Sequence, residues 1–157
     1  MAQPHVDDAL ILDAAKQFRA ALDSVDPLVW HKVTVSNFPK GACGHASELL
    51  GRYLRDLLGI EPLYVVKDND LPGGAWHGGH AWLELDGLII DVTGDQFGWE
   101  TVIVSRSSAR HAEGEPNLRQ ALTTDARWWG RYGAPIYAVA TALMANDAHE
   151  GGSHVER

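Results

Sequence analysis

The chain has 157 residues, a hydrophobic fraction of 45% and a formal net charge of −8, which is typical of one domain with a real core and argues against a nucleic-acid partner. No apolar run is long enough to cross a membrane, no signal peptide is visible, and the lone cysteine excludes an internal disulfide. We therefore expect a single domain over residues 1–147, a flexible tail over 148–157 and a reducing, cytoplasmic location.

The first predicted element is an amphipathic helix over residues 8–22, whose start Asp7 or Asp8 can cap. Its apolar side chains fall on one stripe, which predicts packing against the core. Residues 28–36 have the composition of a strand, and Phe38-Pro39 then fixes the path into the next element. The residues of the apolar stripe are Ile11, Ala14, Phe18 and Leu22.

A second helix is predicted from Ala46, where apolar residues again recur three and four apart, and Gly59 predicts its end. Cys43 then lies in or just before the first turn. The unpaired N–H groups and the positive dipole end of a helix favour a thiolate there, and Gly41 and Gly44 allow a substrate to approach the backbone closely. The alternative is that Cys43 is a small buried apolar residue.

The segment after this helix predicts a strand and a loop. Residues 63–67 form a short apolar run that indicates a buried strand, and residues 68–79 are rich in Gly, Asp and Pro. Such loops commonly line a cleft. His77 in this loop is a candidate substrate contact, with an exposed loop histidine as the equally favoured alternative.

Asp86-Gly87 predicts a β-hairpin with a two-residue loop. Strand alternation then places His80, Trp82 and Asp91 on one face, with Asp91 opposite Trp82 and diagonal to His80. An aspartate at that position can hold the second nitrogen of the imidazole. A slip of one residue would bury every polar group, so the register is well specified. The opposite face is entirely apolar and consists of Ala81, Leu83, Leu85, Leu88, Ile90 and Val92.

Beyond the hairpin, residues 101–105 predict another strand and residues 107–117 predict polar turns. Residues 118–132 are expected to be partly helical, with Gly133 as a stop. Pro135 then suits the first turn of a last helix.

These residues together resemble the transglutaminase-like superfamily within the papain-like cysteine-enzyme fold. The resemblance is carried by Gly-Ala-Cys43, by the helix that ends in Leu-Gly59-Ile-Glu-Pro, by His80-Ala-Trp and by Ile-Asp91-Val-Thr, in the order Cys, His, Asp. It implies an α+β domain whose nucleophile helix packs on an antiparallel sheet. It also implies that Cys43 is the nucleophile, His80 the base and Asp91 the orienting acid.

The sequence leaves open which group binds the oxyanion, because Gly44-His45 follows Cys43 where this superfamily commonly has a tryptophan. The backbone N–H of Cys43 and the side chain of Asn37 are candidates. Gln96 is a further candidate donor to substrate or oxyanion, and Trp82 a candidate substrate contact. Asp95 is the runner-up to Asp91 for the acid role.

A zinc site is the main rival interpretation, because His77 and His80 with Cys43 and His45 are zinc-type ligands. No Cys-x-x-Cys or His-Glu-x-x-His spacing supports it. His45 is more simply a cleft or surface residue than a second base. We therefore expect neither a metal nor a cofactor.

The function expected from the sequence is hydrolysis of a peptide or isopeptide bond through a Cys-His-Asp triad and a thioester. The partner would be a peptide or protein substrate, and the pattern indicates no particular oligomeric state. Deamidation, transglutamination and other acyl transfer use the same triad and stay open. A non-catalytic binding module that kept the fold is the alternative from a different class.

Overall fold

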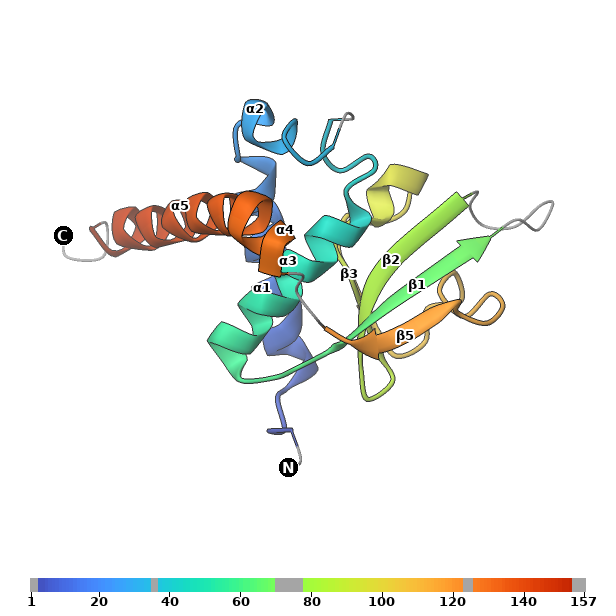
Figure 1. The fold of residues 1–157 in the computed structure, drawn as a ribbon. Helices are drawn as coiled ribbons and strands as arrows, with labels where there is room; N and C mark the ends of the chain where they lie inside the picture. The colour runs from blue at the N-terminus through green and yellow to red at the C-terminus, as the bar shows by residue number, and fades with distance from the viewer. Residues whose placement is uncertain (1–2, 35–36, 70–77, 123–125, 154–157) are drawn as a thin grey trace.

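A computed structural model describes residues 3–34, 37–69, 78–122 and 126–153 and shows helices packed beside one antiparallel sheet (Figure 1). The five strands lie in the order β4-β3-β2-β1-β5, which confirms an α+β fold with an antiparallel sheet. The strands are β1 (Leu63–Asn69), β2 (Gly78–Leu85), β3 (Leu88–Asp91), β4 (Ile103–Ser105) and β5 (Leu118–Ala121). The main helices are α1 (Asp8–Asp23), α3 (Cys43–Leu58) and α5 (Ala134–Ser153).

The helix α1 forms as predicted. The Asp7 carboxylate accepts a hydrogen bond from the Ala9 N–H at 2.8 Å and caps the helix start. The predicted apolar stripe is buried, with Phe18 and Leu22 fully inaccessible to solvent. Through this stripe α1 contacts α3 and α5, and it also reaches the edge strand β4. The helix therefore closes the core between α3, α5 and the β4 edge of the sheet.

The predicted strand over residues 28–36 is wrong, because the described part of this range forms the short helix α2 (Pro27–Trp30) and turns. The Asp26 carboxylate accepts a hydrogen bond from the Leu28 N–H, and Pro27 occupies the first helical turn. These local capping signals outweigh the β-type composition. Trp30 is buried and its indole N–H donates to the Leu22 carbonyl at 3.2 Å. The turn thus anchors an aromatic side chain in the core.

The helix α3 begins at Cys43 and ends at Leu58, and the next residue, Gly59, adopts the left-handed conformation (φ 71°) that favours glycine at a helix end. Its start has no side-chain cap, so backbone N–H groups remain available there. The helix packs on β2 through its buried face. It therefore carries the cysteine to the sheet at the beginning of β2.

The β2–β3 hairpin confirms the predicted register, with Leu85 paired to Leu88 and Leu83 to Ile90. Asp86 and Gly87 both have positive φ (47° and 84°), as the favoured two-residue hairpin turn requires. The predicted apolar face is buried in the core. The opposite face is also buried around His80, Trp82 and Asp91, which are 1%, 0% and 1% exposed. Hence the β2–β3 hairpin has buried polar side chains on one face and buried apolar side chains on the other.

The C-terminal part departs from the sequence-based expectation at two points. Residues 118–121 form β5 and not a helix, because backbone pairing with β1 provides a partner that the local sequence does not reveal. Gly133 does not end a helix as predicted. The short helix α4 (Ala126–Trp128) continues through a π-helical turn (Trp129–Gly133) into α5. A Cβ atom at Gly133 would lie 2.6 Å from the Trp128 ring, so a packing requirement explains this glycine.

The helix α5 begins as expected near Pro135 and runs through Ser153, into the segment that the sequence indicates as a tail. None of the described helices is both long enough and apolar enough to span a membrane.

Candidate active site

Cys43 is the first residue of α3 and is partly exposed. Its thiol hydrogen-bonds with the side chain of His80, and the sulfur accepts from the backbone N–H groups of Ala81 and Gly44. Burial raises the pKa of the thiol, but these hydrogen bonds and the charge of His80 outweigh burial and lower the pKa below its ordinary value. The site therefore favours a thiolate at the helix start.

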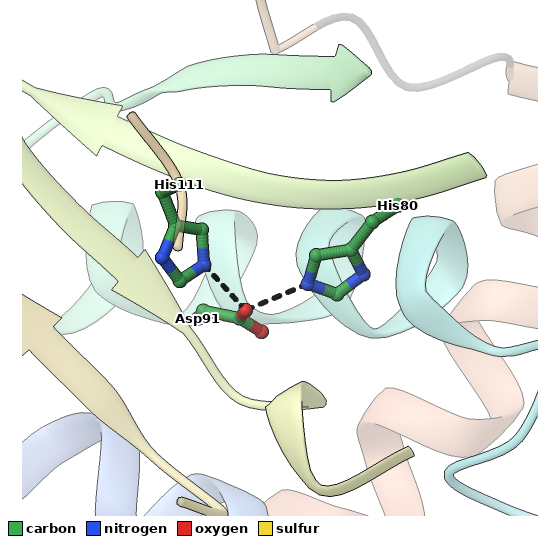
Figure 2. Close-up of side chains that lie close together, drawn as sticks. All are labelled: His80, Asp91 and His111. Atoms are coloured by element: carbon green, nitrogen blue, oxygen red, sulfur yellow. Dashed lines mark hydrogen bonds and ion pairs between the residues drawn. The ribbon is translucent and has the colours of Figure 1, made fainter. Parts of the chain in front are cut away.

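His80 lies on β2 with its imidazole buried between Cys43 and Asp91. Its Nε2–H donates to Asp91 Oδ2 at 2.7 Å (Figure 2), which leaves Nδ1 as the nitrogen available to the thiol. Burial opposes a charged imidazole, yet the bonds to Asp91 and Cys43 outweigh it and raise the pKa of His80 to about 9. The raised pKa of His80 and the lowered pKa of Cys43 both favour a thiolate–imidazolium pair.

Asp91 ends β3 and lies against His80, as the hairpin register predicts. Its Oδ1 accepts the Thr93 N–H at 2.9 Å, while Oδ2 accepts from His80. Burial raises the pKa of this carboxyl, but the bonds to the surrounding imidazoles outweigh it and hold the pKa well below its usual range. The runner-up, Asp95, accepts two hydrogen bonds of 2.7 and 2.8 Å from Arg19, which also donates to the Val92 carbonyl.

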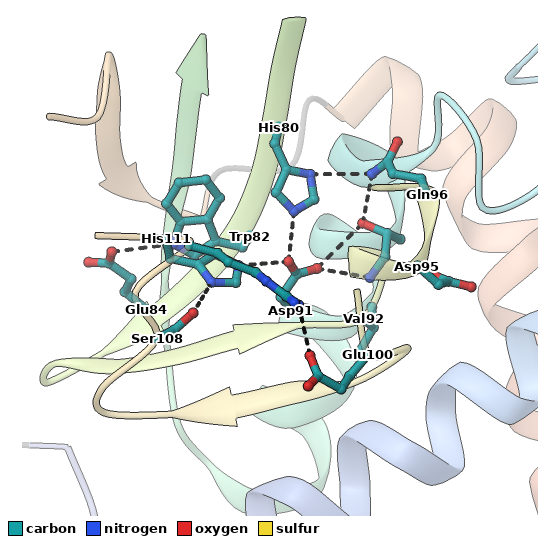
Figure 3. Close-up of polar contacts among 12 residues, drawn as sticks. His80, Trp82, Glu84, Asp91, Val92, Asp95, Gln96, Glu100, Ser108 and His111 are labelled. Carbon is teal, nitrogen blue, oxygen red and sulfur yellow. Dashed lines mark hydrogen bonds and ion pairs between the residues drawn. The ribbon is translucent and has the colours of Figure 1, made fainter. Parts of the chain in front are cut away.

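His111, which the sequence analysis missed, also contacts Asp91. It lies in the segment between β4 and β5, and its Nε2–H donates to Asp91 Oδ2 at 2.8 Å. Ser108 Oγ lies 2.5 Å from His111 Nδ1 (Figure 3). A lone histidine in a polar, turn-like stretch carries no periodic signal, and only the folding of this segment onto the sheet brings it to Asp91.

Aromatic rings surround the two imidazoles. Trp82 lies 5.6 Å from the His80 ring and 4.9 Å from the His111 ring, measured between centroids. Phe97 and Trp99 meet His80 edge-on at 4.9 and 5.8 Å. Exclusion of water by these rings strengthens the electrostatic interactions inside. Trp82, a candidate substrate contact, is thus fully buried and forms a wall of the site.

The remaining predicted site residues lie at different places. Gln96 Nε2 is 3.3 Å from both His80 Nδ1 and Thr93 Oγ1, so this amide lies beside the imidazole (Figure 3). Asn37 instead has its Oδ1 3.2 Å from His31 Nε2, in an exposed contact. His77 lies outside the described residues. His45 is half-buried and its ring stacks on that of Trp128, with 5.0 Å between the centroids.

Tyr64 and Glu48 lie near the start of α3 and were not singled out from the sequence. A Cβ atom at Gly44 would lie 2.9 Å from the Tyr64 hydroxyl, so only glycine admits this close approach. Burial, together with the charges of Cys43 and Glu48, raises the pKa of Tyr64 to about 12. Glu48 has one buried oxygen without a hydrogen-bond partner, and burial raises its pKa to about 7.

The cluster of His80, Asp91 and His111 was tested as a metal site, because its ligand atoms lie within 4.8 Å of one another. Two ligands of a tetrahedral zinc ion with bonds of about 2.1 Å lie about 3.4 Å apart. Here each nitrogen lies only 2.7 or 2.8 Å from Asp91 Oδ2, which is a hydrogen-bond distance. The arrangement therefore fits a hydrogen-bonded network better than a tetrahedral ligand set.

Comparison of the chain with protein-family models, curated proteins and solved structures found no match.

Proposed function

We propose that this protein is a cysteine-dependent hydrolase of the transglutaminase-like type that cleaves an amide bond in a peptide or protein. The single observation that carries the proposal is the chain of contacts from Cys43 through His80 to Asp91. It joins a thiol of lowered pKa to an imidazole whose pKa is about 9. A thiolate is the nucleophilic form of cysteine, so this pair supports acyl-transfer chemistry.

In the proposed reaction the Cys43 thiolate attacks the carbonyl carbon of the amide and forms a tetrahedral oxyanion. The proton on His80 Nδ1 then passes to the leaving amine as the C–N bond breaks, and a thioester remains. The neutral imidazole next takes a proton from water, whose oxygen attacks the thioester and releases the carboxylic acid. Asp91 stays ionised and stabilises the imidazolium, which is present before the attack and forms again when water reacts.

Two groups beside the thiol support the binding of the oxyanion. The start of α3 has backbone N–H groups without a side-chain cap, and the Tyr64 hydroxyl lies over Gly44. Gln96 would have a different role, because its side-chain amide can donate to His80 Nδ1 once that nitrogen has lost its proton. The N–H groups of α3 and the Tyr64 hydroxyl would stabilise the negative charge that develops on the oxyanion.

Mass spectrometry of the intact protein after incubation with a peptide library tests the proposal. We expect a covalent acyl adduct on wild-type Cys43, its absence in Cys43→Ala, and products that carry a new carboxylate. The same incubation with a primary amine separates hydrolysis from transfer, because a dominant amide product would identify a transferase. Alkylation that is slower than that of a free model thiol at about pH 6 would contradict the proposal and favour a binding module.

A further inference from the structure

The Asp91 carboxylate has two imidazole partners on the same oxygen. His80 and His111 donate to Oδ2 at 2.7 and 2.8 Å from opposite sides (Figure 2). Both imidazole side chains are 0% exposed and the carboxylate is 1% exposed. An ionised carboxylate in such a dry place depends on its hydrogen-bond donors for stability. The donor from His111 is therefore part of what keeps Asp91 charged.

Ser108 holds the other side of the His111 ring. When the ring is neutral, the Ser108 hydroxyl can donate to Nδ1, and the ring proton then lies on Nε2. When the ring is charged, both nitrogens carry protons. In either state the Nε2–H points at Asp91, because the ionised carboxylate can only accept a hydrogen bond. The Ser108 hydroxyl, which can donate or accept, satisfies Nδ1 and holds the ring in place.

We propose that His111 is a positioning residue of the active site, which holds Asp91 ionised and oriented toward His80 without touching the substrate. This inference rests on the proposed cysteine chemistry and extends the triad to a chain of five side chains: Ser108, His111, Asp91, His80 and Cys43. A donor to Asp91 stabilises the less protonated form of this unit. Its removal should therefore shift the titration that creates the reactive thiolate to higher pH.

Other charged groups surround the cluster and are left in place by this test. Lys67 on β1 is the cross-strand neighbour of His80 and is 3% exposed. Glu84 on β2 is paired with Arg119 on β5 at 2.9 Å. Arg110 lies over the Trp99 ring at 5.2 Å. Because these groups are unchanged in the variants below, a shift of the pH profile reports on His111 itself.

Three variants separate positioning from mere packing. His111→Leu fills the space but removes the donor. His111→Gln keeps an N–H near the position of Nε2 and should rescue the effect. Ser108→Ala keeps the imidazole but removes the hydroxyl that holds Nδ1, and should have an intermediate effect. Each variant would be checked for folding by chemical denaturation before its reactivity is compared.

The readout is the rate of iodoacetamide alkylation of Cys43, the only cysteine, measured against pH. We expect His111→Leu to move the acid limb upward and to slow alkylation about tenfold at about pH 5.5, a tenfold change corresponding to one pH unit on that limb. His111→Gln should stay within about threefold of wild type, with Ser108→Ala between them.

An unchanged profile in folded His111→Leu would overturn the inference, as would an equal loss in the Leu and Gln variants. If His111→Leu does not fold, Ser108→Ala decides, and a wild-type profile in that variant counts against the role. Slow alkylation of the wild-type protein itself would instead contradict the proposed cysteine chemistry, so the two failures are distinguishable.

Discussion

The substitution Asp91→Asn tests the site most directly, because an asparagine amide cannot satisfy the hydrogen bonds of Asp91 in either of its two orientations. Oδ2 accepts from His80 and His111, and Oδ1 accepts from the Thr93 N–H. An asparagine amide has one oxygen and one NH₂ group, so in either orientation the NH₂ faces a donor. A buried group left unsatisfied in this way costs about 1–3 kcal/mol, and the charge that stabilises the His80 imidazolium is lost as well.

We expect Asp91→Asn to slow Cys43 alkylation near neutral pH, and any catalytic turnover, about 100-fold or more, which corresponds to about 2.7 kcal/mol of lost stabilisation. Both rates should be measured because alkylation requires no knowledge of the substrate. Circular dichroism and chemical denaturation would show whether the variant remains folded. The pH at which the remaining alkylation rate rises should increase toward that of an ordinary thiol, because the thiolate–imidazolium pair is weaker.

The matched control is Asp95→Asn, which alters a nearby carboxylate that does not contact His80 in the structure. It removes one of the two Asp95 oxygens that accept from Arg19 and the negative charge beside this guanidinium, whose side chain is 5% exposed, and should lower the free energy of unfolding by about 1–3 kcal/mol. Its alkylation rate should stay within about threefold of wild type. A greater loss of reactivity in Asp95→Asn than in Asp91→Asn would refute the assignment of the acid.

Glu48 and the metal question give two further predictions. Burial raises the pKa of Glu48 from 4.5 to about 7 in the folded state, so the ionised side chain destabilises the fold increasingly from about pH 4.5 to 7. Glu48→Gln should therefore raise the free energy of unfolding by about 1 kcal/mol at pH 8, after discounting for solvent screening, and by little at pH 4. An equal gain at both pH values would contradict this cause. Elemental analysis and chelator treatment should reveal no stoichiometric zinc and no loss of Cys43 reactivity, whereas one zinc per chain would convert His80, Asp91 and His111 into a ligand set.

Local sequence was sufficient to predict the two main parts of the site. The turn at Asp86-Gly87 requires positive φ at both residues, and strict alternation along the flanking strands then placed Asp91 near His80. The helical periodicity after Ala46, with Gly59 as the stop, placed Cys43 at a helix start. These features could be predicted because each depends on backbone geometry over a few neighbouring residues.

Other features were decided by tertiary structure. β5 forms because β1 offers a free edge, although its own residues gave a helical signal. Gly133 lies within a continuous helical segment, where two tryptophan rings leave no room for a side chain. His111 reaches Asp91 only because the segment between β4 and β5 folds back over the polar face of the sheet. In each case the deciding contact joins residues far apart in sequence, or depends on packing that spacing does not encode. Local sequence therefore determined the hairpin and the helix that begins at Cys43, whereas tertiary structure determined what surrounds Asp91.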